Sequence, residues 1–511
     1  MKIVKQASVQ GKVESVEEVV GQLQSFIGRA AETGRAAHEV ERELFKRLLQ
    51  LGLLLLQQFF ALLGDGDEGE RVKLSEGREL KRLSEPQRRG YRSIFGLLEI
   101  VRWVYARGEQ QRIEYVPLDA RTSLPEGKDS YLRQDWDQRL AVEMPYGQIN
   151  AVLEPILGLN QSVANLEQMS RTLAEQVEGF WATEDTPPVA GEGELIVLSA
   201  DAKGVPMRKA ADAPPITEHA HRPGPKPGRK QMALLGAAYH IEPYVRTPEQ
   251  VLEALFREPT SAAVPNTEPA RPLPQHKRRR AALSEAEAGQ PGHSAAVIFP
   301  WLLAQAQGRE AQPQCPWVVV MDGQPTLWDD LHAVLGDAPR VEVLDLLHAN
   351  GYLWQAVHLF HPPGTEKALA MMKFCLLALL KGKVQELLLW LADQAEQRGL
   401  SASQRQQLAK IIGYFRRHRH RVHYDQYLAA GYPIASGVIE GACRHVVKDR
   451  MERAGMHWTL PGAQAMLRLR CIALNGQWED FMRYYIDQET ARLYPNDPQH
   501  RPEPEALPWA A

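Results

Sequence analysis

The sequence predicts a mixed α/β core that follows a helical N-terminal region. Up to about residue 190, apolar residues recur mainly at three- and four-residue spacing, which is the period of an amphipathic helix. After about residue 192, short apolar runs of strand type alternate with helical segments, the pattern of a sheet packed against helices. The chain of 511 residues is long enough for several domains.

Composition narrows the class of protein. Hydrophobic residues make up 44% and charged residues 24% of the chain, a mixture typical of soluble globular proteins. The formal net charge of −3 excludes a general attraction to nucleic acid, so a DNA-binding surface would have to be a local patch. The four cysteines lack the spacing of a zinc ribbon or a disulfide framework, and the first residues lack an apolar signal segment. We therefore expect a cytoplasmic protein.

The first 85 residues are expected to be mainly helical. The most apolar stretch, Leu48–Leu63, contains three glutamines and is shorter than the roughly 20 residues that a membrane span needs. We expect no membrane association and interpret this helix as buried or as a contact that pairs two chains. Residues Tyr91–Glu109, rich in β-branched and aromatic side chains around Gly96, predict a hairpin.

The segment Tyr146–Leu173 has the spacing of a helix-turn-helix motif. Two helical stretches flank a turn that begins at Gly158. Pro155 inside the first stretch is unfavourable for a helix. An ordinary helical hairpin is the alternative to a DNA-binding motif, and the sequence leaves both readings open.

Four apolar runs predict the strands of the core, which we place in two parts, residues 192–348 and 431–490. Between the parts, residues 349–430 are helical without a strand signal, and residues 491–511 form a tail. Thr247 is expected to cap a helix, Ser436 to cap a later one, and the Pro, Ala and Glu content of residues 258–293 predicts a flexible insertion. The predicted strands are Glu194–Asp201, Gln231–Ile241, the run from Pro316 to Asp322, and Val341–His348.

Three acids stand where such a core would bring them together. Asp201 and Asp322 each end an apolar run, and Glu440 lies in the first turn of a helix. Phosphoryl transfer on nucleic acid commonly uses two divalent ions about 3.5–4 Å apart, and Mg²⁺ prefers carboxylate oxygens. A turn or cap role for each aspartate, and a helix-dipole role for Glu440, are the alternatives.

Basic residues surround the third acid. Glu440, Arg444 and Lys448 recur every four residues, which places them on one face of an α-helix, either as ion pairs or as a metal ligand beside phosphate contacts. Residues 401–470 contain twelve Lys and Arg but four Asp and Glu. The segment Tyr414–Tyr424 mixes aromatic and basic side chains, a pattern that predicts a nucleic-acid backbone track with stacking platforms.

These motifs together resemble a known family. The stretches LSADAKGVPM, VVVMDGQPTLW, EVLDLLH and SGVIEGACRHVVKDRMERAGMHW are similar to bacterial insertion-sequence transposases, with the ISKra type of DDE transposase as the nearest match. The resemblance covers about Ser199–Leu474 and fits the N-terminal half more loosely, through PLDARTSLPEG and AVEMPYGQ. The insertion at residues 258–293 departs from the family pattern.

The resemblance implies an α/β RNase H-like catalytic core, with a helical insertion domain and an α-helical N-terminal region. It implies a DDE site in which Asp201, Asp322 and Glu440 hold two Mg²⁺ or Mn²⁺ ions. Asp345 and His348 match a D-x-x-H element with a supporting role; that His348 only ends a strand is the equal alternative. Expected DNA contacts, from the residues and the family together, are Arg444, Lys448, Arg450, Arg416, Arg417, Arg419, Lys203, Arg229 and Lys230.

The expected function is that of a DNA transposase that cleaves transposon ends and joins them to target DNA. Its partners would be double-stranded DNA and a second copy of the chain, in the bacterial cytoplasm near the nucleoid. Residues 86–185 would bind the transposon end, and Trp458 and Trp478 are candidates for stacking on a displaced base, with core packing as the alternative. Three rivals stay open: a helix-turn-helix regulator with an inactive core, an RNase H-like nuclease that cuts without joining, and an α/β protein whose acids are caps.

Overall fold

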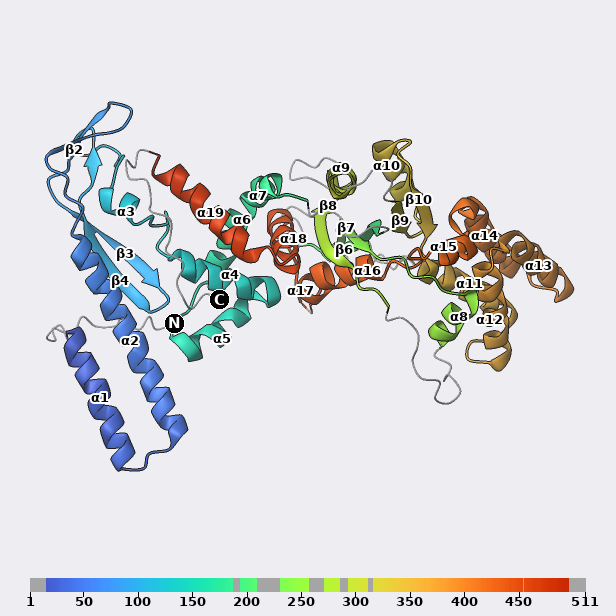
Figure 1. Ribbon diagram of the computed structural model, residues 1–511, viewed down its shortest axis with the longest axis horizontal. Helices are drawn as coiled ribbons and strands as arrows, with labels where there is room; N and C mark the ends of the chain where they lie inside the picture. Colours follow the sequence, from blue (N-terminus) through green and yellow to red (C-terminus); the bar gives the residue numbers. More distant parts are fainter. Residues whose placement is uncertain are drawn as a thin grey trace, which may run out of the picture. The chain divides into compact units, whose positions relative to one another are not determined.

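The computed structural model describes residues 15–186, 194–208, 230–256, 271–284, 293–310, 316–453 and 455–495 (Figure 1). The chain divides into two compact units: residues 1–169 with 479–511, and residues 170–478. The boundary falls inside helix α6, Val163–Glu175.

The first unit begins with a helical hairpin and continues as two small sheets and further helices. Ser15 and Glu18 form a capping box at the start of α1, and buried α1 side chains pack against α2. The predicted hairpin is confirmed, but it spans Gln87–Arg102 because the strands pair on both sides of a turn before Gly96. The elements are α1 Val16–Glu32, α2 Ala37–Leu63, β1 Arg71–Lys73, β2 Glu79–Arg82, β3 Gln87–Ser93, β4 Gly96–Arg102, β5 Tyr105–Ala106, α3 Pro117–Arg121, α4 Tyr131–Glu143, α5 Tyr146–Leu157 and α19 Trp478–Leu493.

The predicted pair of helices with a turn at Gly158 is also confirmed. Gly158 ends α5 in the left-handed conformation, with φ of 67°, which glycine adopts without a steric penalty. Leu153, Leu159 and Leu166 meet in one apolar cluster and hold α5 against α6. Pro155 lies in the last turn of α5, where the helix tolerates it. Whether these helices bind DNA stays a prediction.

The second unit is built on a five-stranded mixed sheet in the order β10-β9-β6-β7-β8. β6 runs parallel to β9, β9 runs parallel to β10, and β7 runs antiparallel to β6 and β8. Helices α9 and α10 cover one face and share an apolar cluster with it, while α11 and the helices after it pack on the other face. This arrangement confirms a mixed α/β core. Its strands are β6 Leu195–Pro206, β7 Lys230–Ile241, β8 Gln275–Leu283, β9 Trp317–Met321 and β10 Val341–Leu344.

The helices of this unit include a group that we call the insertion helices, residues 346–429. They carry much of the larger apolar cluster, from Leu346 to Leu428, as the helical signal of residues 349–430 predicts. The helices are α7 Val177–Thr183, α8 Pro248–Phe256, α9 His293–Arg309, α10 Pro325–Leu335, α11 Leu346–Phe360, α12 Glu366–Leu380, α13 Val384–Gln397, α14 Ala402–Arg417, the short 3-10 helix Arg419–Arg421, α15 Tyr424–Ala429, α16 Gly437–Ala442, the π-helix Cys443–Lys448, α17 Asp449–Met451 and α18 Leu460–Leu474.

Three predicted elements need correction. The predicted flexible insertion 258–293 contains strand β8, which pairs with β7 along the edge of the core sheet. β6 does not end at Asp201 but continues to Pro206, because β7 pairs with it over its full length. The predicted strand Val341–His348 stops at Leu344, since Asp345 caps helix α11 through bonds from two backbone N–H groups.

Candidate metal-dependent active site

Two of the predicted acids lie at the same level of neighbouring parallel strands. The β6–β9 ladder pairs Leu198 with Val319, and three residues further along each strand stand Asp201 and Asp322. Adjacent strands are separated by about 4.8 Å, so the two side chains leave the sheet side by side. β9 ends just before Asp322, whereas β6 continues past Asp201 to Pro206.

A third aspartate extends this row on β10. The β9–β10 ladder pairs Met321 with Leu344, which puts Asp345 level with Asp322. The backbone N–H of Asp345 still donates to the carbonyl of Met321 at 2.8 Å, so the alignment persists past the last strand residue. Three carboxylates therefore stand in a row at the carboxyl ends of β9 and β10 and beside them on β6.

All three aspartates point to the same face of the sheet. An even number of residues before each aspartate stands a valine of the apolar cluster under the insertion helices. These valines are Val197, before Asp201, Val320, before Asp322, and Val343, before Asp345. Because side chains alternate between faces along a strand, the aspartates project to that face as well.

Glu440 approaches this row from helix α16, which packs across β6 and β7. The helix is fixed at both ends. The N–H of Ser436 donates to Asp345 Oδ1 at 2.8 Å, and the thiol of Cys443 lies 3.3 Å from Asp201 Oδ2 as a donor. Ser436 occupies the predicted cap position, but its side chain makes no capping bond; its backbone N–H makes the contact instead.

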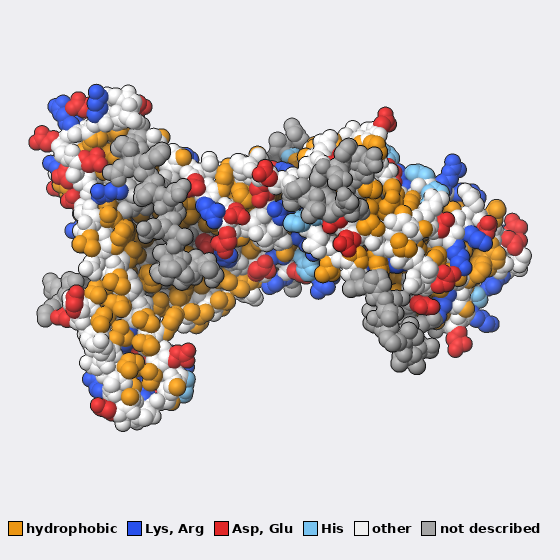
Figure 2. Space-filling model, in the orientation of Figure 1, with side chains coloured by type: hydrophobic (Ala, Val, Ile, Leu, Met, Phe, Trp, Pro, Cys, Tyr) orange, Lys and Arg blue, Asp and Glu red, His pale blue; other side chains and the backbone are white. Residues whose placement is uncertain are grey.

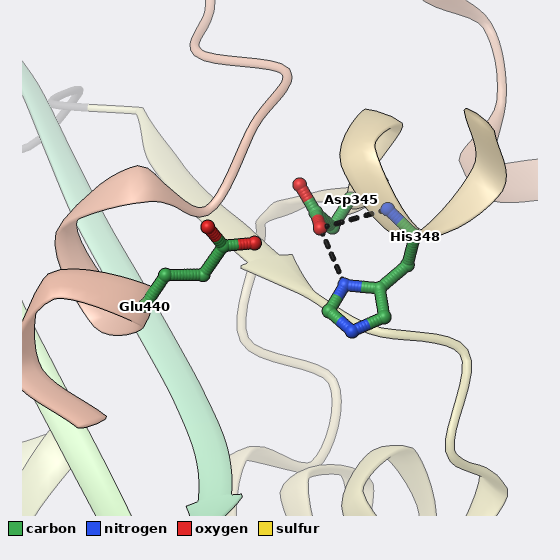
Figure 3. Close-up of side chains that lie close together, drawn as sticks. All are labelled: Asp345, His348 and Glu440. Atoms are coloured by element: carbon green, nitrogen blue, oxygen red, sulfur yellow. Dashed lines mark hydrogen bonds and ion pairs between the residues drawn. The ribbon is translucent and has the colours of Figure 1, made fainter. Parts of the chain in front are cut away.

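Three side chains that could bind a metal ion lie close together. One potential ligand atom from each of Asp345, His348 and Glu440 lies within 4.8 Å of the other two. Figure 3 shows the carboxylate of Glu440 facing the Asp345–His348 pair. His348 Nδ1 lies 2.6 Å from Asp345 Oδ2, within hydrogen-bond distance. The two oxygens of the fully buried Asp345 also accept the N–H groups of Leu347, His348 and Ser436. With four donors on its oxygens, Asp345 is better suited to orient His348 than to bind a metal.

The charges of this cluster act on one another. The hydrogen bond to Asp345, reinforced by the charges of Asp345, Asp322 and Asp201, raises the pKa of His348 to about 9, so the ring is an imidazolium at neutral pH. Burial, and then the charge of Asp201, raises the pKa of Asp322. Burial and the charges of Asp345 and Asp201 raise the pKa of Glu440. Four carboxylates with one imidazolium leave an excess of negative charge that divalent cations would neutralise.

The donor chemistry fits Mg²⁺ or Mn²⁺. Within the described part of the chain, no hydrogen-bond donor reaches the carboxylate of Glu440, and Asp322 binds only the N–H of Gln324 through Oδ1 at 2.9 Å. Oxygen atoms therefore stay open on Asp322 and Glu440, beside Asp201. Hard carboxylate oxygens on rigid elements are the ligands that these ions prefer.

One insertion helix holds the turn that follows Asp322. The ring of Tyr414 lies against Gly323 so closely that a Cβ at that glycine would stand 2.2 Å from Tyr414 Cε2. His418 Nε2 contacts the carbonyl of Gly323 at 3.1 Å. The buried hydroxyl of Tyr414 has no hydrogen-bond partner among the described residues. These contacts position the Asp322 backbone from outside the sheet.

The predicted DNA-contacting residues differ in their ion pairs. Arg416, Arg417 and Arg419 are exposed near the end of α14, and Arg444 and Lys448 are exposed after Glu440. Arg444 Nε lies 3.5 Å from Asp449 Oδ1. Lys230 Nζ, also exposed, binds Glu452 Oε1 at 2.6 Å, and Lys203 Nζ lies 3.9 Å from Glu452 Oε2. Arg229 lies outside the described residues.

The prediction for Arg450 is wrong. Its side chain is buried, with 1% exposed, beneath the ring of Trp458, and its Nη1 donates to Met456. A guanidinium in this position packs the core and cannot reach a phosphate. The stacking roles suggested for Trp458 and Trp478 are wrong for the same reason, since both indoles are buried.

Two further expectations about this region fail. Residues Cys443–Lys448 form a π-helix, whose i→i+5 bonds break the four-residue repeat that was expected to align Glu440, Arg444 and Lys448. In the segment Tyr414–Tyr424 the aromatic rings are internal: Phe415 and Tyr424 are buried, and Tyr414 stacks on Tyr352 with ring centroids 3.9 Å apart. The exposed side chains of that segment are Arg416, Arg417, Arg419, His420 and His423, whereas Arg421 is buried.

Sequence reasoning missed the parts of the site that depend on tertiary contact. No sequence signal places Cys443 on Asp201 or Tyr414 on Gly323, because these pairs are far apart in the chain. The row of aspartates was accessible in principle, since all three follow apolar runs. Comparison with known proteins gives no match, either to a family model or to a curated protein.

Proposed function

We propose that the chain is a DDE-type DNA transposase whose mixed α/β core is RNase H-like. The observation that carries the proposal is the alignment of Asp201, Asp322 and Asp345 on parallel strands, with Glu440 facing them from α16. These acids are buried or half-buried, and most of them lack a cationic partner of their own among the described residues. Such a row of acids destabilises the fold, so a protein without a metal to bind there would gain nothing from it. A metal-dependent phosphoryl transferase has a use for it.

In this proposal Asp201, Asp322 and Glu440 hold two Mg²⁺ or Mn²⁺ ions, and Asp345 and His348 support them. Bound ions would supply neutralisation of the scissile phosphate and activation of the attacking oxygen. His348 keeps its Nε2–H for a phosphate oxygen, because Asp345 engages Nδ1. Asp345 fixes both this ring and the first turn of α16, so it sets the position of Glu440 relative to the strands.

The chemistry consists of two displacements at phosphorus. In the first, a water oxygen bonds to the phosphorus at the transposon end, the bond to the 3′ oxygen breaks, and that oxygen leaves as a 3′-OH. In the second, this hydroxyl bonds to a target phosphorus and releases a target 3′ oxygen, which joins the two DNAs. Positioning and charge neutralisation provide most of the catalysis.

The remaining parts of the proposal concern the partner and the place of action. Double-stranded DNA would contact the exposed arginines at the end of α14 and the exposed Arg444 and Lys448, while α5 and α6 would read the transposon end. The reaction would take place on bacterial DNA in the cytoplasm.

The test is a cleavage assay with the purified full chain and Mg²⁺. Labelled DNA that carries the sequences flanking the coding region would be incubated with the protein and a supercoiled target. We expect cuts that leave 3′-OH ends, and joined products with the target. Glu440→Gln should abolish both, whereas Glu396→Gln, at an exposed acid on α13, should retain both.

The outcomes separate the rival functions. Cuts without joined products would indicate an RNase H-like nuclease. Specific binding without cuts, unchanged by Mg²⁺, would indicate a helix-turn-helix regulator with an inactive core. Cleavage by Glu440→Gln at near the wild-type rate would contradict the assignment of this acid.

A further inference from the structure

We infer that two copies of the chain associate through an apolar stripe on helix α2, which forms the central seam of a four-helix bundle. The stripe is defined by five exposed residues: Phe45, Leu48, Leu55, Phe59 and Leu62. This inference stands apart from the proposed function, because a chain without any catalytic activity would still pair through this surface.

The stripe has the repeat of a coiled coil. Its members follow one another at steps of three, seven, four and three residues, and Gly52 fills the missing position in the seven-residue step. Alternating steps of three and four put side chains on one seam that faces a second helix. At Gly52 the ring of Phe95, from the turn between β3 and β4, lies so close to the helix that a Cβ would stand 2.6 Å from it. This ring is 36% exposed and supplies the apolar surface at that position of the seam.

Apart from the contact of Phe95 at Gly52, the stripe side chains stay largely exposed in the described part of the chain. α1 packs along a different side of α2, through buried residues that include Leu23 and Phe26. The five stripe side chains are between 42% and 81% exposed. Figure 2 shows hydrophobic side chains gathered over the α1–α2 hairpin. In the described chain this hairpin therefore presents an unsatisfied apolar face.

A membrane is a poor occupant for this face. Among the described residues, α2 is the one helix that is long and apolar enough to cross a bilayer by length and composition. Its uncharged part, Leu48–Leu63, is about 24 Å long, less than the roughly 30 Å of a hydrocarbon core. Phe60, near its end, is buried in the core of the first unit with Leu98 and Ile100. For the helix to cross a bilayer, Phe60 would have to leave this apolar cluster.

A second copy satisfies both the area and the charge of the surface. At about 200 Å² for a fully exposed large apolar residue, the five side chains leave on the order of 500 Å² uncovered. Two such stripes give about 1,000 Å², the lower limit of a specific interface. The first part of α2 carries three acids and three bases, so two copies meet without net repulsion: Glu39, Glu41, Glu43, Arg42, Lys46 and Arg47.

The geometry also defines the form of the pair. One stripe against an identical stripe is an isologous contact, which closes on a twofold axis and gives a dimer. Each chain brings a hairpin of two helices, so the product is a four-helix bundle. Val20 and Ile27 on α1, also partly exposed and seven residues apart, would extend the seam at its side.

The test measures the mass of the full chain by light scattering during size-exclusion chromatography at micromolar concentration. We expect twice the chain mass of 57.5 kDa. The double variant Leu55→Glu/Leu62→Glu should run as a 57.5 kDa monomer, with a dissociation constant about 100-fold weaker, because charges would face each other across the seam. Leu389→Glu, at a leucine on α13 that is 67% exposed, is the matched control and should stay dimeric.

Several results would overturn the inference. A monomeric wild-type chain would do so without any variant, and so would a double variant that folds and stays dimeric. If the charged variant does not melt cooperatively, Leu55→Gln/Leu62→Gln replaces it and must also weaken the dimer. Flotation of the wild-type chain with phosphatidylcholine vesicles, lost in the double variant, would show that lipid is the occupant instead.

Discussion

Replacing Asp345 with Asn tests the link between the strand row and His348. The amide oxygen can still accept the N–H groups of Ser436 and Leu347. The amide NH₂, which is a donor, then takes the place of the oxygen that faces His348. The backbone N–H and the protonated Nδ1 of His348 are donors as well, so neither can bond to the NH₂. The variant therefore loses two hydrogen bonds to a buried charged group, at about 1.5–3 kcal/mol each. We expect the free energy of unfolding to fall by roughly 3–6 kcal/mol near neutral pH.

Part of this loss depends on pH, because the partner titrates. Asp345 is the main cause that raises the pKa of His348 from 6.5 to about 9. A raised histidine pKa stabilises the fold fully below the ordinary value and loses this contribution as the pH rises through about 9. The shift corresponds to about 3 kcal/mol in full, which we reduce to about 1–2 kcal/mol because 42% of the side chain is exposed.

Urea unfolding of wild type and Asp345→Asn, with EDTA present, measures both parts. The difference between them should be larger at pH 6 than at pH 10 by about 1–2 kcal/mol. In a His348→Gln background this pH dependence should disappear, because the titrating ring is gone. A difference that stays constant between pH 6 and pH 10 in the wild-type background, or one that still depends on pH in the His348→Gln background, would refute the proposed coupling of Asp345 to His348.

Three further predictions concern the surroundings of the site and the first unit. Gly323→Ala should lower both the melting temperature and the cleavage rate, with a loss of about 1–3 kcal/mol in stability, because the added methyl group would overlap the ring of Tyr414. The control Gly413→Ala, at a glycine with open space around it, should lower neither. Equal effects of the two substitutions would contradict the packing of Tyr414 on Gly323. Asp137→Asn should stabilise the chain at pH 7.5 by on the order of 1–3 kcal/mol, because burial raises the pKa of Asp137 to about 6 and destabilises only the charged carboxylate. The gain in stability, measured by urea unfolding, should vanish towards pH 4. A gain that does not change with pH would contradict this explanation. The third prediction replaces three exposed arginines by alanine: Arg416, Arg417 and Arg419. The triple variant should bind all DNA sequences more weakly to the same extent, reduce the slope of log affinity against log salt concentration by up to about 3, and keep the melting temperature of the wild type. A loss confined to one DNA sequence would indicate base readout instead.

The sequence predicted the elements that local chemistry determines. Apolar runs identified β7 and β9 closely, and Thr247 caps α8 through its side chain as expected. Asp201, Asp322 and Glu440 were identified because each acid interrupts or follows an apolar or helical pattern, and the structure brings all three into one electrostatic cluster.

The remainder depended on contacts that composition does not encode. β8 resembles a flexible basic segment because its arginines are polar, yet Arg278 and Arg279 donate to carbonyls near Asn475 while the backbone joins the sheet. Arg450 resembles a surface cation, but Trp458 covers it. The π-helical turn after Glu440 has no signature in residue spacing. In each case a tertiary partner overrides the local pattern.

The most direct test of the central claim is a calorimetric titration of the full chain with Mn²⁺. We expect two bound ions in the wild type and a marked loss of affinity in each of three single variants, Asp201→Asn, Asp322→Asn and Glu440→Gln, while Glu396→Gln should bind as the wild type does. Binding that is unchanged in all three variants, or no binding to the folded wild-type chain, would contradict this claim.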